Sequence, residues 1–303
     1  TLRQAGVEPG SLLTTSALLT AVIGLALQET LGNLVAGLAI QAQRPFEVGD
    51  FIQFDADPRH IGQVVEINWR ATRILTEDRV EMVVPNGPLA KSAIKNFTKP
   101  DHHLRRTVVF SVPQSQPPLR VKDAVLKAVG GLTHVAVNPA PQVLINSWKD
   151  KDQHVEYVLQ YVVEKFEERE RLDSAMRERI WYALERAGVM PRLPVGEAEL
   201  TAVEQRLGAI DFLAALTAEQ RTQLARAVEK RTYLNGETII SAGDEGSEFF
   251  ILQRDEVRIL VGGNEVARLK PGAFFGEMSL LTGERRSATV TAVGDVQLLV
   301  VGH

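Results

Sequence analysis

The chain has 303 residues, of which 45% are hydrophobic and 24% are charged, a composition of folded protein rather than of a disordered segment. Its net charge of −4 at pH 7 argues against a general electrostatic attraction to nucleic acid, and no nucleic-acid partner is expected. There is no cysteine in it, which excludes disulfides, thiolate metal sites and cysteine nucleophiles. Its length predicts two or three domains.

The hydrophobic residues are concentrated near the start of the chain. No charged residue occurs from Leu12 to Leu27, and after Gln28 and Glu29 none follows until Arg44. A helix needs about 20 apolar residues to cross a bilayer. No basic segment precedes the run, so a signal peptide fits poorly. The pattern predicts a membrane-spanning helix, with a buried helix of a soluble protein as the alternative.

Small residues recur along one stripe of this helix. They lie at Ala17, Ala21, Gly24, Gly32, Ala36 and Ala39, with Gln28 on the same stripe. Small side chains allow close packing between membrane helices, whereas Glu29 is costly in lipid and should face water or a partner. A ring of identical helices around an aqueous path satisfies both demands and requires an oligomer.

Six fragments follow one another along the first third of the chain: residues 24–28 (GLALQ), 31–37 (LGNLVAG), 44–50 (RPFEVGD), 62–64 (GQV), 70–72 (RAT) and 83–87 (VVPNG). In this order and spacing they resemble the small-conductance mechanosensitive channel (MscS) family. The resemblance implies a pore-lining helix in residues 1–43, kinked near 28–32, and a homo-oligomer in the lipid bilayer, a heptamer if it follows the family. The family has further transmembrane helices upstream, so the sequence is expected to be part of a longer chain.

The same resemblance assigns roles to residues of the helix. Leu25 and Ala21 occupy the two positions that narrow the pore. The family usually has large apolar residues at both, so Ala21 implies a wider constriction. Gln28, Glu29 and Gly32 form the expected kink, and Glu29 stands where the family has a glycine, which departs from the usual closing geometry.

A β-domain and an α+β domain are expected next. Short β-rich runs at 51–54, 64–67 and 81–84 predict a β-domain over residues 44–100, as in the MscS family. Strands at 107–112 and 155–163, with helices at 121–129 and 167–187, predict an α+β domain over residues 101–190. The second helix places Met176, Ile180 and Leu184 on one buried face. The histidines lack ligand-like spacing, so no metal site is expected.

Prolines and a glycine in 191–196 predict a linker over residues 191–203, with a helix through 201–209 opening the next domain.

Strand-like runs separated by glycine turns follow, at residues 249–253, 257–261, 265–269 and 288–292. This spacing predicts a jelly roll or barrel. Residues 274–290 (FFGEMSLLTGERRSATV) resemble the phosphate-binding cassette of cyclic nucleotide-binding domains, which implies such a domain over residues 204–303. The family closes its pocket with a lid helix after the barrel, and the sequence ends before one.

The cassette resemblance assigns the ligand contacts. Glu277 takes the ribose 2′-hydroxyl and Arg286 the cyclic phosphate, to which a guanidinium donates two charge-assisted hydrogen bonds. Ser287 approaches the base. The remaining contacts come from Gly276, Ser279 and Ala288, through their backbone amides, and from the neighbouring Met278. The alternative for Arg286 is a surface arginine paired with Glu284 or Glu277, and Arg285 is expected to be exposed.

The predicted fold is a membrane pore helix, a β-domain and an α+β domain, followed by a β-roll cyclic nucleotide-binding domain. The predicted function is an MscS-type ion channel in the bacterial inner membrane, gated by a nucleotide on its cytoplasmic domains. We favour cAMP over cGMP as the commoner bacterial messenger, and expect no cofactor. No nucleophile, base and orienting group form a set, so the protein is not expected to be an enzyme. The alternatives are a tension-gated osmotic release channel modulated by nucleotide and a soluble nucleotide-sensing regulator.

Overall fold

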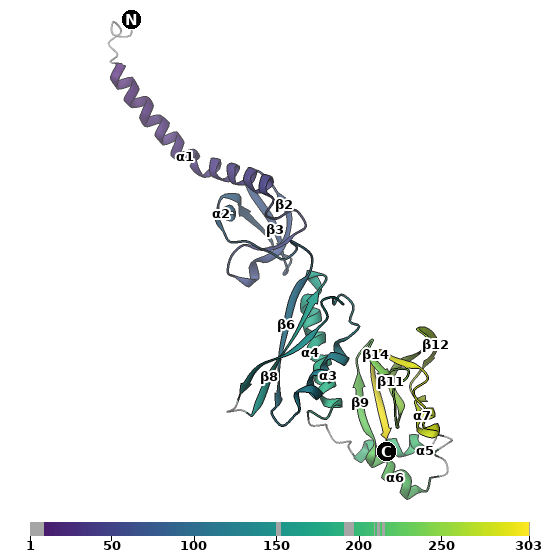
Figure 1. Ribbon diagram of the computed structural model, residues 1–303. Coiled ribbons are helices and arrows are strands. Elements are labelled where there is room, and N and C mark those ends of the chain that lie inside the picture. Colours follow the sequence, from purple (N-terminus) through teal and green to yellow (C-terminus); the bar gives the residue numbers. More distant parts are fainter. Residues whose placement is uncertain are drawn as a thin grey trace. The chain divides into compact units, whose positions relative to one another are not determined.

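The computed structural model describes residues 9–149, 153–190, 197–208, 210, 213 and 216–302. The chain divides into two compact units, Thr1–Leu104 and Arg105–His303. The first unit contains the N-terminal helix and a small β-domain, and the second contains an α+β domain and a β-roll (Figure 1).

Helix α1 (Pro9–Gln43) is continuous over 35 residues and changes direction along its length (Figure 1). At 1.5 Å per residue this is about 50 Å, longer than a bilayer's hydrocarbon core of about 30 Å. Its residues 14–43 are long and apolar enough to cross a membrane. Residues 1–8 of the predicted pore helix lie outside the described residues.

The second half of α1 packs against the β-domain through one stripe. Asn33, Gly37 and Ile40 are buried, and their spacing of four and three residues places them on one helix face. The Asn33 side-chain oxygen accepts a hydrogen bond of 2.8 Å from the Gly87 backbone. A Cβ atom at Gly37 would lie 2.6 Å from the Asn86 side-chain nitrogen, so only glycine fits this contact.

The β-domain is an antiparallel five-stranded sheet in the order β4-β3-β2-β1-β5. Phe46, Ile52 and Ile74 are buried in its core. Strand β3 was not among the predicted strands, although part of it lies in the RAT fragment. The elements are β1 (Phe51–Gln53), β2 (Ile61–Ile67), β3 (Ala71–Thr76), β4 (Glu81–Pro85), α2 (Asn86–Lys91) and β5 (Lys95–Asn96).

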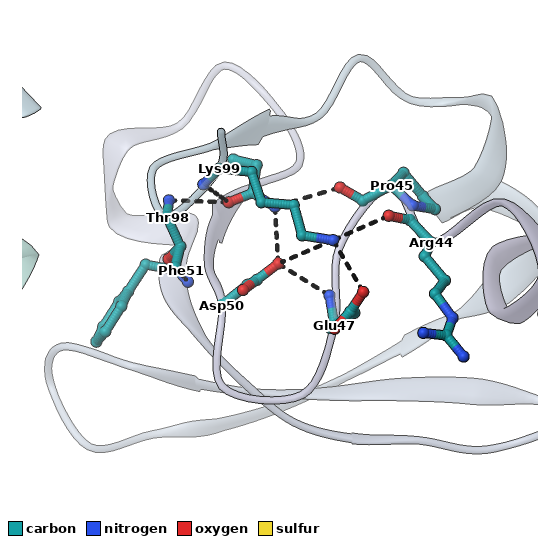
Figure 2. A network of polar contacts seen from close by, with 8 residues as sticks. Arg44, Pro45, Glu47, Asp50, Phe51, Thr98 and Lys99 are labelled. Carbon is teal, nitrogen blue, oxygen red and sulfur yellow. Dashed lines mark hydrogen bonds and ion pairs between the residues drawn. The ribbon is translucent and has the colours of Figure 1, made fainter. Parts of the chain in front are cut away.

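A polar network joins the segment after α1 to the end of the β-domain (Figure 2). The Lys99 ammonium donates to the Arg44 backbone oxygen and to the Glu47 carboxylate, both at 3.1 Å. Asp50 accepts hydrogen bonds from the Asn96 side chain at 2.8 Å and from the Glu47 backbone at 2.9 Å. The RPFEVGD fragment therefore closes the β-domain by holding its two ends together.

The α+β domain is a three-stranded sheet, in the order β6-β8-β7, packed against two helices (Figure 1). Met176, Ile180 and Leu184 of α4 are buried against the sheet, as their spacing predicts. Strand β7 was not predicted. The elements are β6 (Leu104–Pro113), α3 (Pro118–Val129), β7 (Gln142–Lys149), β8 (His154–Val163) and α4 (Arg169–Arg186).

The β-roll is built on a sheet in the order β10-β14-β11-β12, with β9 on β14 and β13 on β11. The strands predicted at 249–253 and 257–261 are one strand, β11, because bulges beside Arg254 absorb extra residues without ending the pairing with β14. The elements are β9 (Glu229–Tyr233), β10 (Thr238–Ile240), β11 (Glu248–Val261), β12 (Asn264–Leu269), β13 (Phe274–Phe275), α7 (Glu277–Thr282) and β14 (Thr289–Gly302).

The linker prediction needs a correction. Residues 191–196 lie outside the described residues, but α5 (Glu197–Gly208) begins inside the segment predicted as linker. Val203 and Leu207 of α5 are buried in one apolar cluster with Phe249 and Val301 of the β-roll. This packing makes the segment a helix of the β-roll domain. Helix α6 (Ala218–Ala227), which was not predicted, begins at a capping box in which Thr217 and Gln220 bond reciprocally.

Candidate functional site

A cavity of about 250 Å³ lies in the β-roll beside α7. Its polar lining comes from α7 and from the segment that leads into β14, and its apolar lining includes Ile240, Leu269 and Phe274. The seven residues expected to contact a nucleotide all line this cavity: Gly276, Glu277, Met278, Ser279, Arg286, Ser287 and Ala288. The fold therefore brings the two ends of the cassette together around one space.

Arg286 is the main cation of this cavity. Its residue is 8% exposed, and its guanidinium donates to the backbone oxygens of Gly276 at 2.6 Å and Glu248 at 2.7 Å. It forms no ion pair with a carboxylate in the described part of the chain. Burial lowers the pKa of the guanidinium from its ordinary value. The alternative of a surface arginine paired with Glu277 or Glu284 is therefore wrong.

Glycines leave room for this guanidinium. Gly276 precedes α7 with a φ of 85°, a left-handed conformation that favours glycine. A Cβ atom there would lie 2.7 Å from the nearer Arg286 nitrogen, and one at Gly246 would lie 2.3 Å from the other. Gly246 was not among the predicted site residues, because it lies outside the cassette of residues 274–290 to which those residues were assigned.

The backbone of the same turn holds Arg286 in register. The Arg286 nitrogen donates to the Asp244 oxygen, and the Gly243 nitrogen donates to the Arg286 oxygen, both at 2.8 Å. The neighbouring Arg285 does not line the cavity. Its side chain is 66% exposed and pairs with Glu245 at 2.7 Å. The two adjacent arginines thus have different environments, one buried without a carboxylate and the other exposed with one.

The predicted pore residues lie on α1, in the other unit. Ala21, Leu25, Gln28 and Glu29 are exposed in the single chain, Leu25 by 72%. A Cβ atom at Gly32 would meet nothing within 4 Å. Within the described part of the single chain, these positions are therefore not packed against another element.

No group of three or more histidine, aspartate or glutamate residues in the described part of the chain is placed to hold a metal ion.

Comparison with known protein families agrees with this arrangement. Residues 29–99 match the model of the mechanosensitive ion channel β-domain, and residues 230–303 match that of the cyclic nucleotide-binding domain. The chain combines a mechanosensitive-channel β-domain with a cyclic nucleotide-binding domain. The channel-family β-domain and the apolar helix α1 together indicate a membrane location.

Relatives resemble one or the other part. The mechanosensitive channel MscK of Escherichia coli (strain K12) is 30% identical over 143 residues, which is 47% of this chain and 12% of MscK. A cAMP-dependent protein kinase regulatory subunit of Hypocrea atroviridis is 34% identical over 99 residues, 33% of this chain and 21% of that protein. The chain therefore spans about a fifth or less of these relatives' lengths.

The fold of the channel-like part is also seen in a solved structure. The crystal structure of Helicobacter pylori MscS in its closed state matches with a TM-score of 0.54 and 21% sequence identity. The match covers 64% of this chain and 76% of the Helicobacter chain. At this identity the likeness establishes the fold.

Proposed function

We propose that this chain is part of an MscS-type ion channel whose opening depends on a cyclic nucleotide bound in the β-roll cavity. The observation that carries the proposal is the buried Arg286 guanidinium, which lines a cavity and has no carboxylate partner in the described chain. Burying a charge is costly unless an opposite charge pairs with it. A cyclic phosphate supplies that charge at the cassette.

The rest of the cavity suits a nucleoside. Glu277 lines it beside Arg286 and can accept the ribose 2′-hydroxyl, and apolar residues such as Ile259 and Phe274 can cover the base. The kinship with a cAMP-dependent kinase subunit supports a cyclic nucleotide as the ligand, and we favour cAMP over cGMP. We assign the cavity a binding role and no catalytic step.

Helix α1 supports the pore assignment. Leu18, Leu25 and Val35 are each more than half exposed, although apolar. A lipid bilayer and neighbouring copies of α1 would cover such a surface, with Ala21 and Leu25 facing the pore. Gly24 and Gly32, where an added Cβ atom would meet no described atom within 4 Å, would then allow close helix packing. We propose a heptamer in the bacterial inner membrane, with both C-terminal domains in the cytoplasm.

The second unit offers a route from nucleotide to channel. Helix α4 of the α+β domain contacts the β-roll through Arg186, which forms an ion pair with Glu237, and through Arg179, which donates to the Asn235 backbone oxygen. A nucleotide that binds one conformation of the β-roll more tightly would raise the population of that conformation. Because α4 contacts the β-roll, the conformation of the α+β domain would shift with it.

Recordings from membrane patches test the proposal. The full-length channel is held at constant tension while cAMP is added to the cytoplasmic face. We expect open probability to change with cAMP, the change to disappear in Arg286→Ala and to persist in Arg285→Ala. A current that follows tension but ignores nucleotide would favour the osmotic release channel. A full-length protein that stays monodisperse without detergent would favour the soluble regulator.

A further inference from the structure

A second cavity, of about 420 Å³, lies in the second unit between α4 and the β-roll. Four arginines line it: Arg171 and Arg179 of α4, Arg258 of β11 and Arg268 of β12. None of the described residues in its lining is acidic, and none is shared with the nucleotide cavity. This arginine cavity has the size of a small-molecule site.

Two of its arginines are already neutralised. Arg171 donates to the Glu168 carboxylate at 2.6 Å, and Arg268 donates to the Glu265 carboxylate at 2.7 Å. Both arginine side chains are at least half exposed, so these pairs are exchangeable surface contacts of small strength. An anion in the cavity could therefore bind both guanidinium groups without disrupting a buried contact.

The other two arginines carry uncompensated charge. Arg179 is 3% exposed, and its guanidinium donates to backbone oxygens, at 2.8 Å to that of Ala128. Arg258 donates through Nε to the Thr291 hydroxyl at 2.7 Å. Neither forms an ion pair with a carboxylate in the residues that the structure describes.

Two carboxylates that act on these charges are held by other arginines. Glu237 interacts with Arg179 but is paired with Arg186, and Glu265 interacts with Arg258 but is paired with Arg268. Two guanidinium charges therefore remain beside one cavity, one of them buried. A ligand with two negative charges would balance them.

We propose that the arginine cavity binds a small phosphate-bearing anion, with Arg179 and Arg258 as its main partners and Arg171 and Arg268 at its edge. A phosphate group carries close to two negative charges at neutral pH. The planar guanidinium matches two phosphate oxygens at once. Because its arginines come from α4 and from the β-roll, the bound anion would bridge the two domains. This site is independent of the proposed nucleotide site.

Calorimetry on the full-length protein in detergent tests the site, with inorganic pyrophosphate as the probe at fixed ionic strength. We expect binding to the wild type, and binding at least about tenfold weaker in Arg171→Gln/Arg258→Gln, because each lost charge-assisted hydrogen bond costs about 1.5 kcal/mol or more. Arg226→Gln, an exposed arginine of α6 outside the cavity, is the matched control and should bind as the wild type does. The single variant Arg171→Gln changes only an exposed residue, so it provides a second binding measurement if the double variant does not fold.

Further binding measurements show which cavity holds the anion and what kind of anion it is. Arg286→Ala should bind pyrophosphate normally, because Arg286 lies in the other cavity. Loss of binding in Arg286→Ala, unchanged binding in the double variant, or no binding to the wild type would each overturn the site. Tighter binding of a nucleoside triphosphate than of pyrophosphate would support the site with a nucleotide as its ligand, and equal binding would support it with an inorganic one.

Discussion

The Arg186 guanidinium of α4 and the Glu237 carboxylate before β10 form an ion pair at 2.9 Å, with side chains only 13% and 2% exposed. Arg186 also lies over the Tyr233 ring, 4.3 Å from its centre, and Glu237 accepts a hydrogen bond of 2.6 Å from the Leu234 backbone. The Arg186 guanidinium of α4 and the Glu237 carboxylate of the β-roll therefore neutralise each other across the contact between the two domains. The pair therefore ties the α+β domain to the nucleotide-binding domain.

Glu237→Gln should weaken this contact strongly. Removing one partner of a buried ion pair leaves the other charge uncompensated, at a cost of about 3 kcal/mol. We expect a lower free energy of unfolding in denaturant, cAMP affinity close to the wild type, and loss of the channel's response to cAMP. Glu245→Gln, which breaks the exposed pair with Arg285, should cost less than about 1 kcal/mol. A full cAMP response in Glu237→Gln would show that coupling uses another route.

Arg286→Ala should weaken cyclic nucleotide binding by roughly thirtyfold or more, since losing the partner of a buried charge costs about 2–5 kcal/mol. Arg285→Ala should have a much smaller effect, because Arg285 is exposed and paired with Glu245. Calorimetry with cAMP and cGMP measures both affinities. Equal losses in the two variants would contradict the cassette assignment. A cGMP preference that Ser287→Ala abolishes would reverse our choice of ligand.

Leu25→Ser should raise the closed-state current without changing nucleotide affinity. An apolar ring resists wetting when the pore is closed, and a hydroxyl removes that barrier. Leu27→Ser is the matched control, because two residues along an α-helix turn the side chain by about 200°. Patch recordings at rest measure both variants. An equal leak in the two, or none in Leu25→Ser, would remove Leu25 from the pore constriction.

Gly37→Ala should loosen α1 from the β-domain. The added Cβ atom would approach the Asn86 side chain to 2.6 Å and the Trp69 backbone oxygen to 2.7 Å, and backbone cannot move aside cheaply. We expect the unfolding temperature of the channel in detergent to fall by several degrees. The Cβ atom added by Gly32→Ala meets no described atom of the single chain within 4 Å. A fall in Gly32→Ala as well would show that neighbouring copies pack against that position.

Asp173 should make the α+β domain sensitive to acid. Burial alone would raise the pKa of its carboxyl, but hydrogen bonds from Arg106 and Tyr161 outweigh burial and hold the pKa below its usual range. The stabilisation is therefore present above the unfolded pKa of about 3.9 and lost as the pH falls below it. Unfolding followed from pH 6 to pH 2 should show this loss, and Asp173→Asn should lower stability at pH 6 and flatten the profile below pH 4.

Local patterns in the sequence predict much of this protein. The uncharged run from Leu12 predicts the long helix, because an apolar run of this length without charges has few alternatives to a membrane-spanning helix. The spacing of Met176, Ile180 and Leu184 predicts the buried face of α4, since helical geometry alone places them together. The cassette residues are close in sequence, so their common cavity follows from one short helix and the strand after it.

Contacts between distant segments were decided only by the tertiary structure. Burial of Gly37 depends on Asn86 and Trp69, and room for the Arg286 guanidinium depends on Gly246, forty residues earlier in the sequence. The pairing of Arg186 with Glu237, and the gathering of arginines from α4, β11 and β12, join segments with no shared motif. Burial and charge compensation belong to the assembled fold, so no local pattern encodes them.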